Sequence, residues 1–347
     1  MEQTAHQGLE SLPPELLLAI AEQLPVDSRL VFSGTCSSFH SIIQSNRLTR
    51  CSGRDLDFFT FLDYLTAIAR DLPDMWVCEI CLALHAVNRQ DTPQSPLATS
   101  CFRKPGNAVI GRKLCWPQHR HVQIVLKYTR LGVQDPDRRR HLAELLDPVF
   151  GNHPPDPQDS WIAHVTYASR AKIVNGRYLL KYTWHYNATS EPIESLCRGY
   201  NAHLLICNHQ YVPGYLMAKI FQRIEQPGEQ EAARIAAQSP QPLTEPLAVR
   251  RATRESLLDD QRGIELTDSC TLCPTDFSIC VGEDCVWFSA WYDLGPEGSP
   301  FDEAWTCHRI NEPWGTISRS LKARHVPGSI RRLYQQTAHR DIENEVE

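Results

Sequence analysis

The sequence predicts an α+β protein in which a small N-terminal helical unit precedes an irregular domain of helices and β-hairpins supported by zinc. Three observations carry this prediction. An apolar repeat with a helical period opens the chain, two later segments alternate apolar and polar residues, and cysteines and histidines cluster between short runs. With 347 residues, 42% of them hydrophobic and 22% charged, the chain is long enough for about two globular domains.

The first two predicted helices form one compact unit. Residues 11–24 begin with prolines that suit the first turn of a helix and continue with leucines and isoleucine at steps of three and four. Pro25 ends this helix, and Asp27 or Ser28 can cap a second helix over residues 28–43. About forty residues bury too little surface to hide so wide an apolar band, so the unit has apolar surface to spare.

Two more helices are expected farther along the chain. Residues 54–70 repeat the helical period directly after the first unit, and residues 120–131 carry a similar pattern. A polar loop rich in proline and glycine is expected over residues 88–113, and residues 132–160 are predicted to be rich in loops.

Two segments predict β-hairpins. Residues 161–186 alternate apolar and polar side chains on both sides of Asn175 and Gly176, a pair typical of tight hairpin turns. Residues 263–293 alternate again, which predicts a second hairpin in the same sheet or a neighbouring one.

Residues 226–247 contain proline, glutamine, glutamate and alanine with almost no large apolar side chain, so they predict a disordered insertion. The expected segments are a disordered tail over 1–8, the helical unit over 9–50, a helix with a Cys/His-rich segment and the first hairpin region over 54–225, the insertion loop over 226–262, the second hairpin region of the same C-terminal domain over 263–337, and an acidic tail over 338–347.

Charge and the N-terminal sequence limit the partners. The 35 basic and 41 acidic residues give a net charge of −6, which offers no general attraction to nucleic acid or anionic lipid. The N-terminus lacks the pattern of a secretory signal, and no apolar run approaches the length that spans a bilayer. We therefore expect an intracellular protein, cytoplasmic or nuclear, that binds neither nucleic acid nor membrane.

The opening helical pair resembles the F-box, especially as found in filamentous-fungal F-box proteins. The residues that carry this resemblance are Leu12-Pro13, Glu15-Leu16-Leu17, Ile20, Leu24-Pro25, Ser28 to Leu30, Thr35-Cys36 and Phe39. The cysteine-bearing segment that begins near Trp76 also looks like the region that follows the box in many of these fungal proteins. Without the resemblance, the same leucines are equally consistent with the core of a larger helical domain.

The resemblance implies a partner and the residues that bind it. F-boxes bind the Skp adaptor of SCF-type cullin-RING ubiquitin ligases through their apolar positions. In this chain those positions are Leu12, Pro13, Leu16, Leu17, Ile20, Leu24, Leu30 and Phe32.

Cysteines at metal-binding spacing predict two zinc sites. Cys78 and Cys81 form a C-x2-C pair that can supply two of the four ligands of a tetrahedrally coordinated zinc ion. Cys115 with His119 is the candidate second pair. The alternates for that second pair are His85 and Cys101.

The second expected site joins Cys207 and His209 to another C-x2-C pair, Cys270 and Cys273. For both sites the alternative is that these are buried thiols packing as small apolar groups. Cys280 follows Cys273 as in a binuclear zinc-cysteine DNA-binding cluster, but the intervening residues include no lysine or arginine, so we reject that assignment.

The resemblance therefore implies a non-catalytic adaptor with no catalytic residues. We expect it to bind the Skp subunit and to present an unidentified substrate protein through its C-terminal domain, with structural zinc. One alternative is an F-box scaffold that works outside a ligase. Another is a zinc-dependent hydrolase or deaminase, which would need a three-ligand site with an open position and a nearby carboxylate.

Overall fold

In a computed structural model, the chain folds into two compact units. The first contains the described residues up to Asn88 together with Gly298–Phe301, and the second contains the rest. The structure describes residues 9, 12–46, 56–97, 116–152, 165–187, 203–207, 209–213, 265–282, 285–308 and 324–336. The predicted tails and the insertion over 226–262 lie outside this range, as do residues 98–113 of the polar loop.

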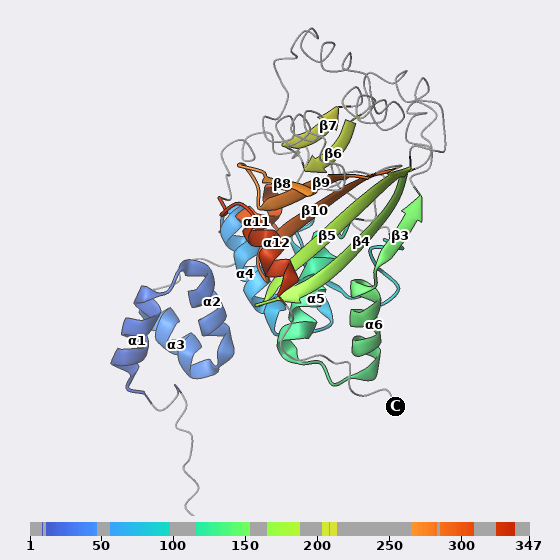
Figure 1. Ribbon diagram of the computed structural model, residues 1–347. Helices are drawn as coiled ribbons and strands as arrows, with labels where there is room; N and C mark the ends of the chain where they lie inside the picture. Colours follow the sequence, from blue (N-terminus) through green and yellow to red (C-terminus); the bar gives the residue numbers. More distant parts are fainter. Residues whose placement is uncertain are drawn as a thin grey trace, which may run out of the picture. The chain divides into compact units, whose positions relative to one another are not determined.

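Three short helices, α1, α2 and α3, open the first unit (Figure 1). They span Pro14–Gln23, Val26–Thr35 and Ser37–Ser45, so the prediction of a single second helix over 28–43 is wrong. The break lies at Cys36, whose backbone is extended with φ −156° and ψ 162°. Its sulfur accepts a hydrogen bond from the Phe39 amide at 3.4 Å, so Cys36 caps the start of α3.

The interior of these three helices is small. Leu17, Ala21, Phe39 and Ile43 are buried, and the ring of Phe32 stacks on that of Phe39 with centroids 4.3 Å apart. Few apolar side chains are fully buried here, and Leu16 and Ile20 on α1 remain exposed. The surplus of apolar surface expected from the sequence is therefore present on this unit.

Helix α4, Phe58–Arg70, completes the first unit with a small hairpin of β1, Met75–Cys78, and β2, Ala83–Ala86. The helix starts where the Asp57 carboxylate accepts the amide hydrogens of its first turn, four residues later than the predicted start. Its apolar face packs Leu62, Leu65 and Ala69 against Val77 of β1. This packing holds the hairpin on the helix.

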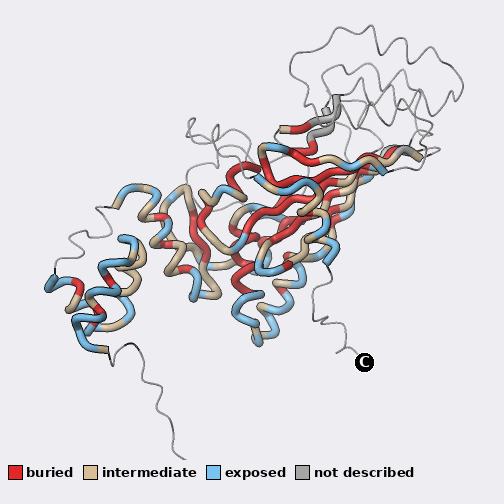
Figure 2. Tube along the Cα trace, turned by 60° about the vertical axis from the view of Figure 1, so that its left-hand side comes forward, coloured by how far each residue is buried: buried red, intermediate tan, exposed pale blue. Residues whose placement is uncertain are grey.

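The second unit is built around a six-stranded antiparallel sheet in the order β3-β4-β5-β10-β9-β8. Both predicted hairpins are confirmed, and they share this sheet because β5 pairs with β10. Figure 2 shows that the buried residues follow its strands. The strands are β3 (Val149–Asn152), β4 (Val165–Val174), β5 (Arg177–Asn187), β8 (Glu265–Ser269), β9 (Thr275–Val281) and β10 (Cys285–Pro296).

The turn between β4 and β5 shows why the sequence forms a hairpin there. Asn175 and Gly176 have φ values of 51° and 70°, the left-handed region that a two-residue hairpin turn of this type requires. A separate two-stranded sheet joins β6, His203–Cys207, to β7, Gln210–Pro213. Neither β6–β7 nor β8 was predicted as a strand in its own right.

Helices cover both faces of the sheet (Figure 1). Helix α12, Ser329–Gln335, places Arg331 over the ring of Trp291 on one face. On the opposite face Trp116, just before α5 (His119–Leu131), packs against Tyr182 and Tyr292.

Two further helices complete the second unit. Helix α6, Pro136–Leu146, and strand β3 occupy the segment predicted to be rich in loops, so that prediction is wrong. The Asp135 side chain and Pro136 at the first helical position supply its start signal. Helix α11 is a single turn over Glu303–Thr306. No helix in the described part of the chain is both long and apolar enough to cross a membrane.

Candidate metal centre and docking helices

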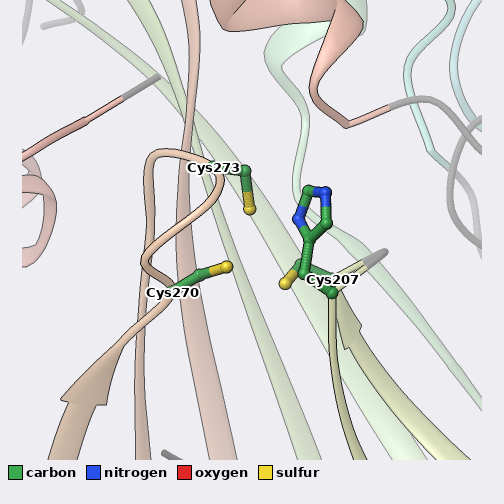
Figure 3. A group of neighbouring side chains, drawn as sticks. Cys207, Cys270 and Cys273 are labelled. Atoms are coloured by element: carbon green, nitrogen blue, oxygen red, sulfur yellow. The ribbon is translucent and has the colours of Figure 1, made fainter. Parts of the chain in front are cut away.

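Four side chains from two hairpins converge in the second unit. Cys207 ends β6, His209 lies in the turn before β7, and Cys270 and Cys273 lie in the turn between β8 and β9. The ligand atoms of all four lie within 4.8 Å of one another. Figure 3 shows the sulfurs of Cys207, Cys270 and Cys273 pointing toward a common centre. The structure thus brings together the second of the two predicted ligand sets.

The local backbone presents the C-x2-C pair. The Cys270 amide donates to the Thr275 carbonyl at 2.8 Å, and the Thr275 amide donates to the Cys273 carbonyl at 2.7 Å, which closes the turn. The Leu272 amide points at the Cys270 sulfur, 3.4 Å away. Amide hydrogens directed at a cysteine sulfur favour its thiolate form, which is the form that binds metal.

The cluster is closed to solvent at its sulfurs. Cys207 and Cys273 are 0% exposed and Cys270 is 1% exposed. The Tyr292 hydroxyl of β10 donates a hydrogen bond to the Ile206 carbonyl, and this contact holds the end of β6 against the sheet. The site therefore lies between the β6–β7 hairpin and the six-stranded sheet.

The protonation of the three thiols differs. Burial raises the pKa of Cys207 and of Cys273 well above the usual value. The pKa of Cys270 is lowered, because hydrogen bonds from the side chains of Cys207 and Cys273 stabilise its thiolate. Ionising three buried thiols that lie close together costs free energy, because the thiolates repel one another, unless a cation neutralises their charge.

The imidazole of His209 adds a second sign of a ligand site. Its Nδ1 atom is buried and has no hydrogen-bond partner among the described residues. A buried ring nitrogen without a partner costs free energy, and a metal ion would satisfy it. The donor set of three thiolates and one imidazole is one that binds zinc in closed tetrahedral sites. A closed set of four ligands with no open position for substrate is typical of structural sites.

The first predicted ligand set is brought together in part. Cys78 and Cys81 lie with His85 in the first unit, and their ligand atoms are within 4.8 Å of one another. His119 is not in this group, since it lies on α5 beside Trp305 and 2.7 Å from the Gln123 amide nitrogen.

The remaining candidates for the first set, Cys115 and Cys101, lie outside the described residues. His85, one of the two alternates for the second pair of ligands, is the residue that the structure places beside Cys78 and Cys81. Its position four residues after Cys81 was the sequence signal for this role.

The eight apolar residues expected to bind an adaptor occupy different environments. Leu17 is buried inside the three helices with 3% of its surface exposed, so it stabilises the unit. Leu16 and Ile20, on the outer side of α1, are 52% and 38% exposed. Pro13 is exposed, and Leu12, Leu24, Leu30 and Phe32 are partly buried. Leu9 and Val26, which sequence reasoning did not select, are also exposed.

Comparison with known proteins identifies the N-terminal helices. Residues 9–51 match the family model of the F-box domain. The chain carries an F-box domain. F-box proteins are in general non-catalytic adaptors that bind the Skp subunit of SCF-type ubiquitin ligases. No curated protein and no solved structure matches the chain.

Proposed function

We propose that the chain is a substrate adaptor of an SCF-type cullin-RING ubiquitin ligase, related to the fungal F-box proteins. The observation that carries this proposal is the F-box match over residues 9–51. The adaptor binds Skp through α1 and α2 and presents a substrate protein through its C-terminal part. It performs no bond chemistry, and it acts by raising the effective concentration of a target lysine near the ligase.

The exposed side of α1 supports this docking surface. Leu16 and Ile20 lie one helical turn apart and leave apolar surface in solvent, and Pro13 extends the same side toward the N-terminus. We include in this surface Leu24, which follows Ile20 by four residues, and Leu30 of α2, both of which are partly buried. Leu17 is excluded from the surface because it is already buried within the unit. An apolar strip at the centre of an interface is the usual source of binding free energy.

Reconstitution tests the proposal in two steps. The purified chain should form a stable complex with a Skp adaptor and, through it, with a cullin-RING core. Addition of candidate substrates obtained by affinity purification should then give ubiquitin transfer that depends on the chain. Adaptor binding without transfer to any captured protein would favour a scaffold outside the ligase, and absence of adaptor binding would refute the docking surface.

We also propose that zinc is the ion held by Cys207, His209, Cys270 and Cys273. The burial of the three cysteines, the buried Nδ1 of His209 that has no hydrogen-bond partner among the described residues, and the soft donor set support zinc over a hard cation such as magnesium. The ion would tie the β6–β7 hairpin to the turn between β8 and β9. Metal analysis of the purified chain tests this, with Cys270→Ser expected to lose one equivalent of zinc.

The matched control for that measurement is Cys280→Ser. Cys280 lies on β9, seven residues beyond Cys273, and is not part of the ligand group. The control should keep the full zinc content. Equal zinc content in the wild-type chain and in Cys270→Ser would refute the assignment.

A further inference from the structure

The first unit carries a second group of side chains that could ligate a metal ion, on a hairpin outside helices α1 to α3. Cys78 ends β1, Cys81 lies in the connection to β2, and His85 lies on β2. Their ligand atoms all lie within 4.8 Å of one another, and the Cys81 sulfur is 2.9 Å from Nε2 of His85. Two thiols and one imidazole at this separation form three corners of a tetrahedral site.

The hairpin fixes the direction of the imidazole. His85 pairs directly with Trp76 across the two strands, and their rings stack with centroids 4.8 Å apart and an interplanar angle of 20°. This stack restricts the ring of His85 and leaves Nε2 directed at the Cys81 sulfur. A ring held by an aromatic neighbour is pre-organised, so little rotational freedom is lost when an ion binds.

The connection between the strands is shaped to return Cys81 toward Cys78. The first cross-strand pair on either side of it is Cys78 with Ala83, so four residues make the reversal. Leu82, which follows Cys81, has φ 50°, a left-handed conformation that costs a leucine about 1 kcal/mol or more. A hairpin of two four-residue strands is only marginally stable by itself. The free energy of binding an ion would offset the cost of the Leu82 conformation.

The distances fit zinc after a small adjustment. With bonds of about 2.3 Å to sulfur and about 2.0 Å to nitrogen, two tetrahedral ligands lie about 3.5 Å apart. The Cys81 sulfur and Nε2 of His85 would therefore separate by about 0.6 Å to admit the ion. Because Cys81 is exposed and lies in a short connection, this movement needs no change in the core.

We propose that Cys78, Cys81 and His85 hold a second zinc ion, separate from that of the Cys207 cluster and released faster from the protein. The contrast in exposure sets the rates. In the Cys207 cluster the three cysteines are at most 1% exposed, so a chelator reaches their sulfurs only after local opening. Cys81 is exposed and His85 is half-buried, so a chelator attacks this ion directly.

The test measures zinc content and zinc release on the full-length chain purified under reducing conditions. A chromogenic chelator in excess should release zinc in two phases, with the fast phase at least about tenfold faster than the slow one. Cys81→Ser and His85→Ala should each remove the fast phase and lower the zinc content by one equivalent. Cys270→Ser should instead remove the slow phase.

Cys36→Ser is the matched control in the same unit, because Cys36 caps α3 and is in neither ligand group. It should keep both phases. Unchanged zinc content in both Cys81→Ser and His85→Ala would overturn the proposal, as would a single release phase that only Cys270→Ser removes. That last result leaves the zinc of the Cys207 cluster in place, so the failures of the two sites are distinguishable. Adaptor binding is a third, independent readout.

Discussion

The docking side of α1 is tested most directly by placing a charge on it. Leu16 is 52% exposed in the chain by itself, so docking can bury about half of its side chain. Full burial of a leucine contributes about 1.5–3 kcal/mol, so its loss here costs about 1 kcal/mol of binding free energy. In Leu16→Asp the carboxylate would also be buried in the interface without a partner, which adds about 2–5 kcal/mol.

The two contributions together predict a weakening of about 3–6 kcal/mol, or at least about 100-fold in Kd for the Skp adaptor. Ile20→Asp, one turn farther along α1, should have a similar effect because Ile20 is 38% exposed. Titration of the purified chain with the adaptor, followed by calorimetry, measures this change. The free energy of unfolding of the isolated chain should change by only about 0.5 kcal/mol, since both side chains are at the surface.

Two further variants make the result interpretable. Gln44→Asp adds the same charge at an exposed position of α3 outside the proposed surface, and it should bind the adaptor normally. Leu17→Asp places a charge at a position that is 3% exposed, so it should unfold the three helices. It therefore shows how adaptor binding is lost when the helical unit unfolds, in contrast to the loss of a surface contact. Normal adaptor affinity in both Leu16→Asp and Ile20→Asp would refute the reasoning.

Three other predictions concern the stability of the second unit. Cys270→Ser should lower the free energy of unfolding of zinc-loaded protein by about 4 kcal/mol, as measured by denaturant titration, because the ion binds only the folded state. Burial opposes the charged form of Asp91, yet His121 and Arg120 hold its pKa well below the usual range. A lowered pKa adds stability above the unfolded value of about 4 and loses it as the pH falls through the folded value. Asp91→Asn should therefore cost about 3–5 kcal/mol at neutral pH and flatten the acid dependence. Gly176→Ala should cost about 1 kcal/mol, measured by thermal unfolding, because φ at Gly176 is 70°.

Each of these predictions has a result that would contradict it. Equal stability of Cys270→Ser and wild type with and without chelator would mean that the Cys207 cluster holds no structural ion. If the free energy of unfolding of Asp91→Asn fell with decreasing pH as steeply as that of the wild type, the Asp91 carboxylate would not be charged in the folded state. Asn175→Gly is the control for Gly176→Ala, because glycine adopts the left-handed conformation of that turn at no steric cost.

Local patterns were predictable because they depend on neighbouring residues. The presence of α1 and α5 and the Asn175-Gly176 turn follow from proline, apolar-period and turn residues that act within one or two helical turns or a single loop, although α1 begins three residues later than the predicted start at residue 11. The break at Cys36 was missed, since the apolar period continues through it and only the cap on Phe39 reveals it. Helix α6 was missed because its sequence is polar and its few apolar residues gave no clear period.

By itself, the sequence determined the F-box pattern, the two hairpins of the sheet and the two C-x2-C pairs, because each is encoded in residues close together along the chain. Only the tertiary structure decided which ligands meet. Cys207 and His209 reach Cys270 and Cys273 because β8, β9 and β10 pair in one register and Tyr292 holds Ile206 against the sheet. The tertiary structure likewise separated Leu17, which packs inside the helical unit, from Leu16 and Ile20, which remain in solvent. Such choices depend on packing between segments far apart in sequence, and a linear pattern does not contain that packing.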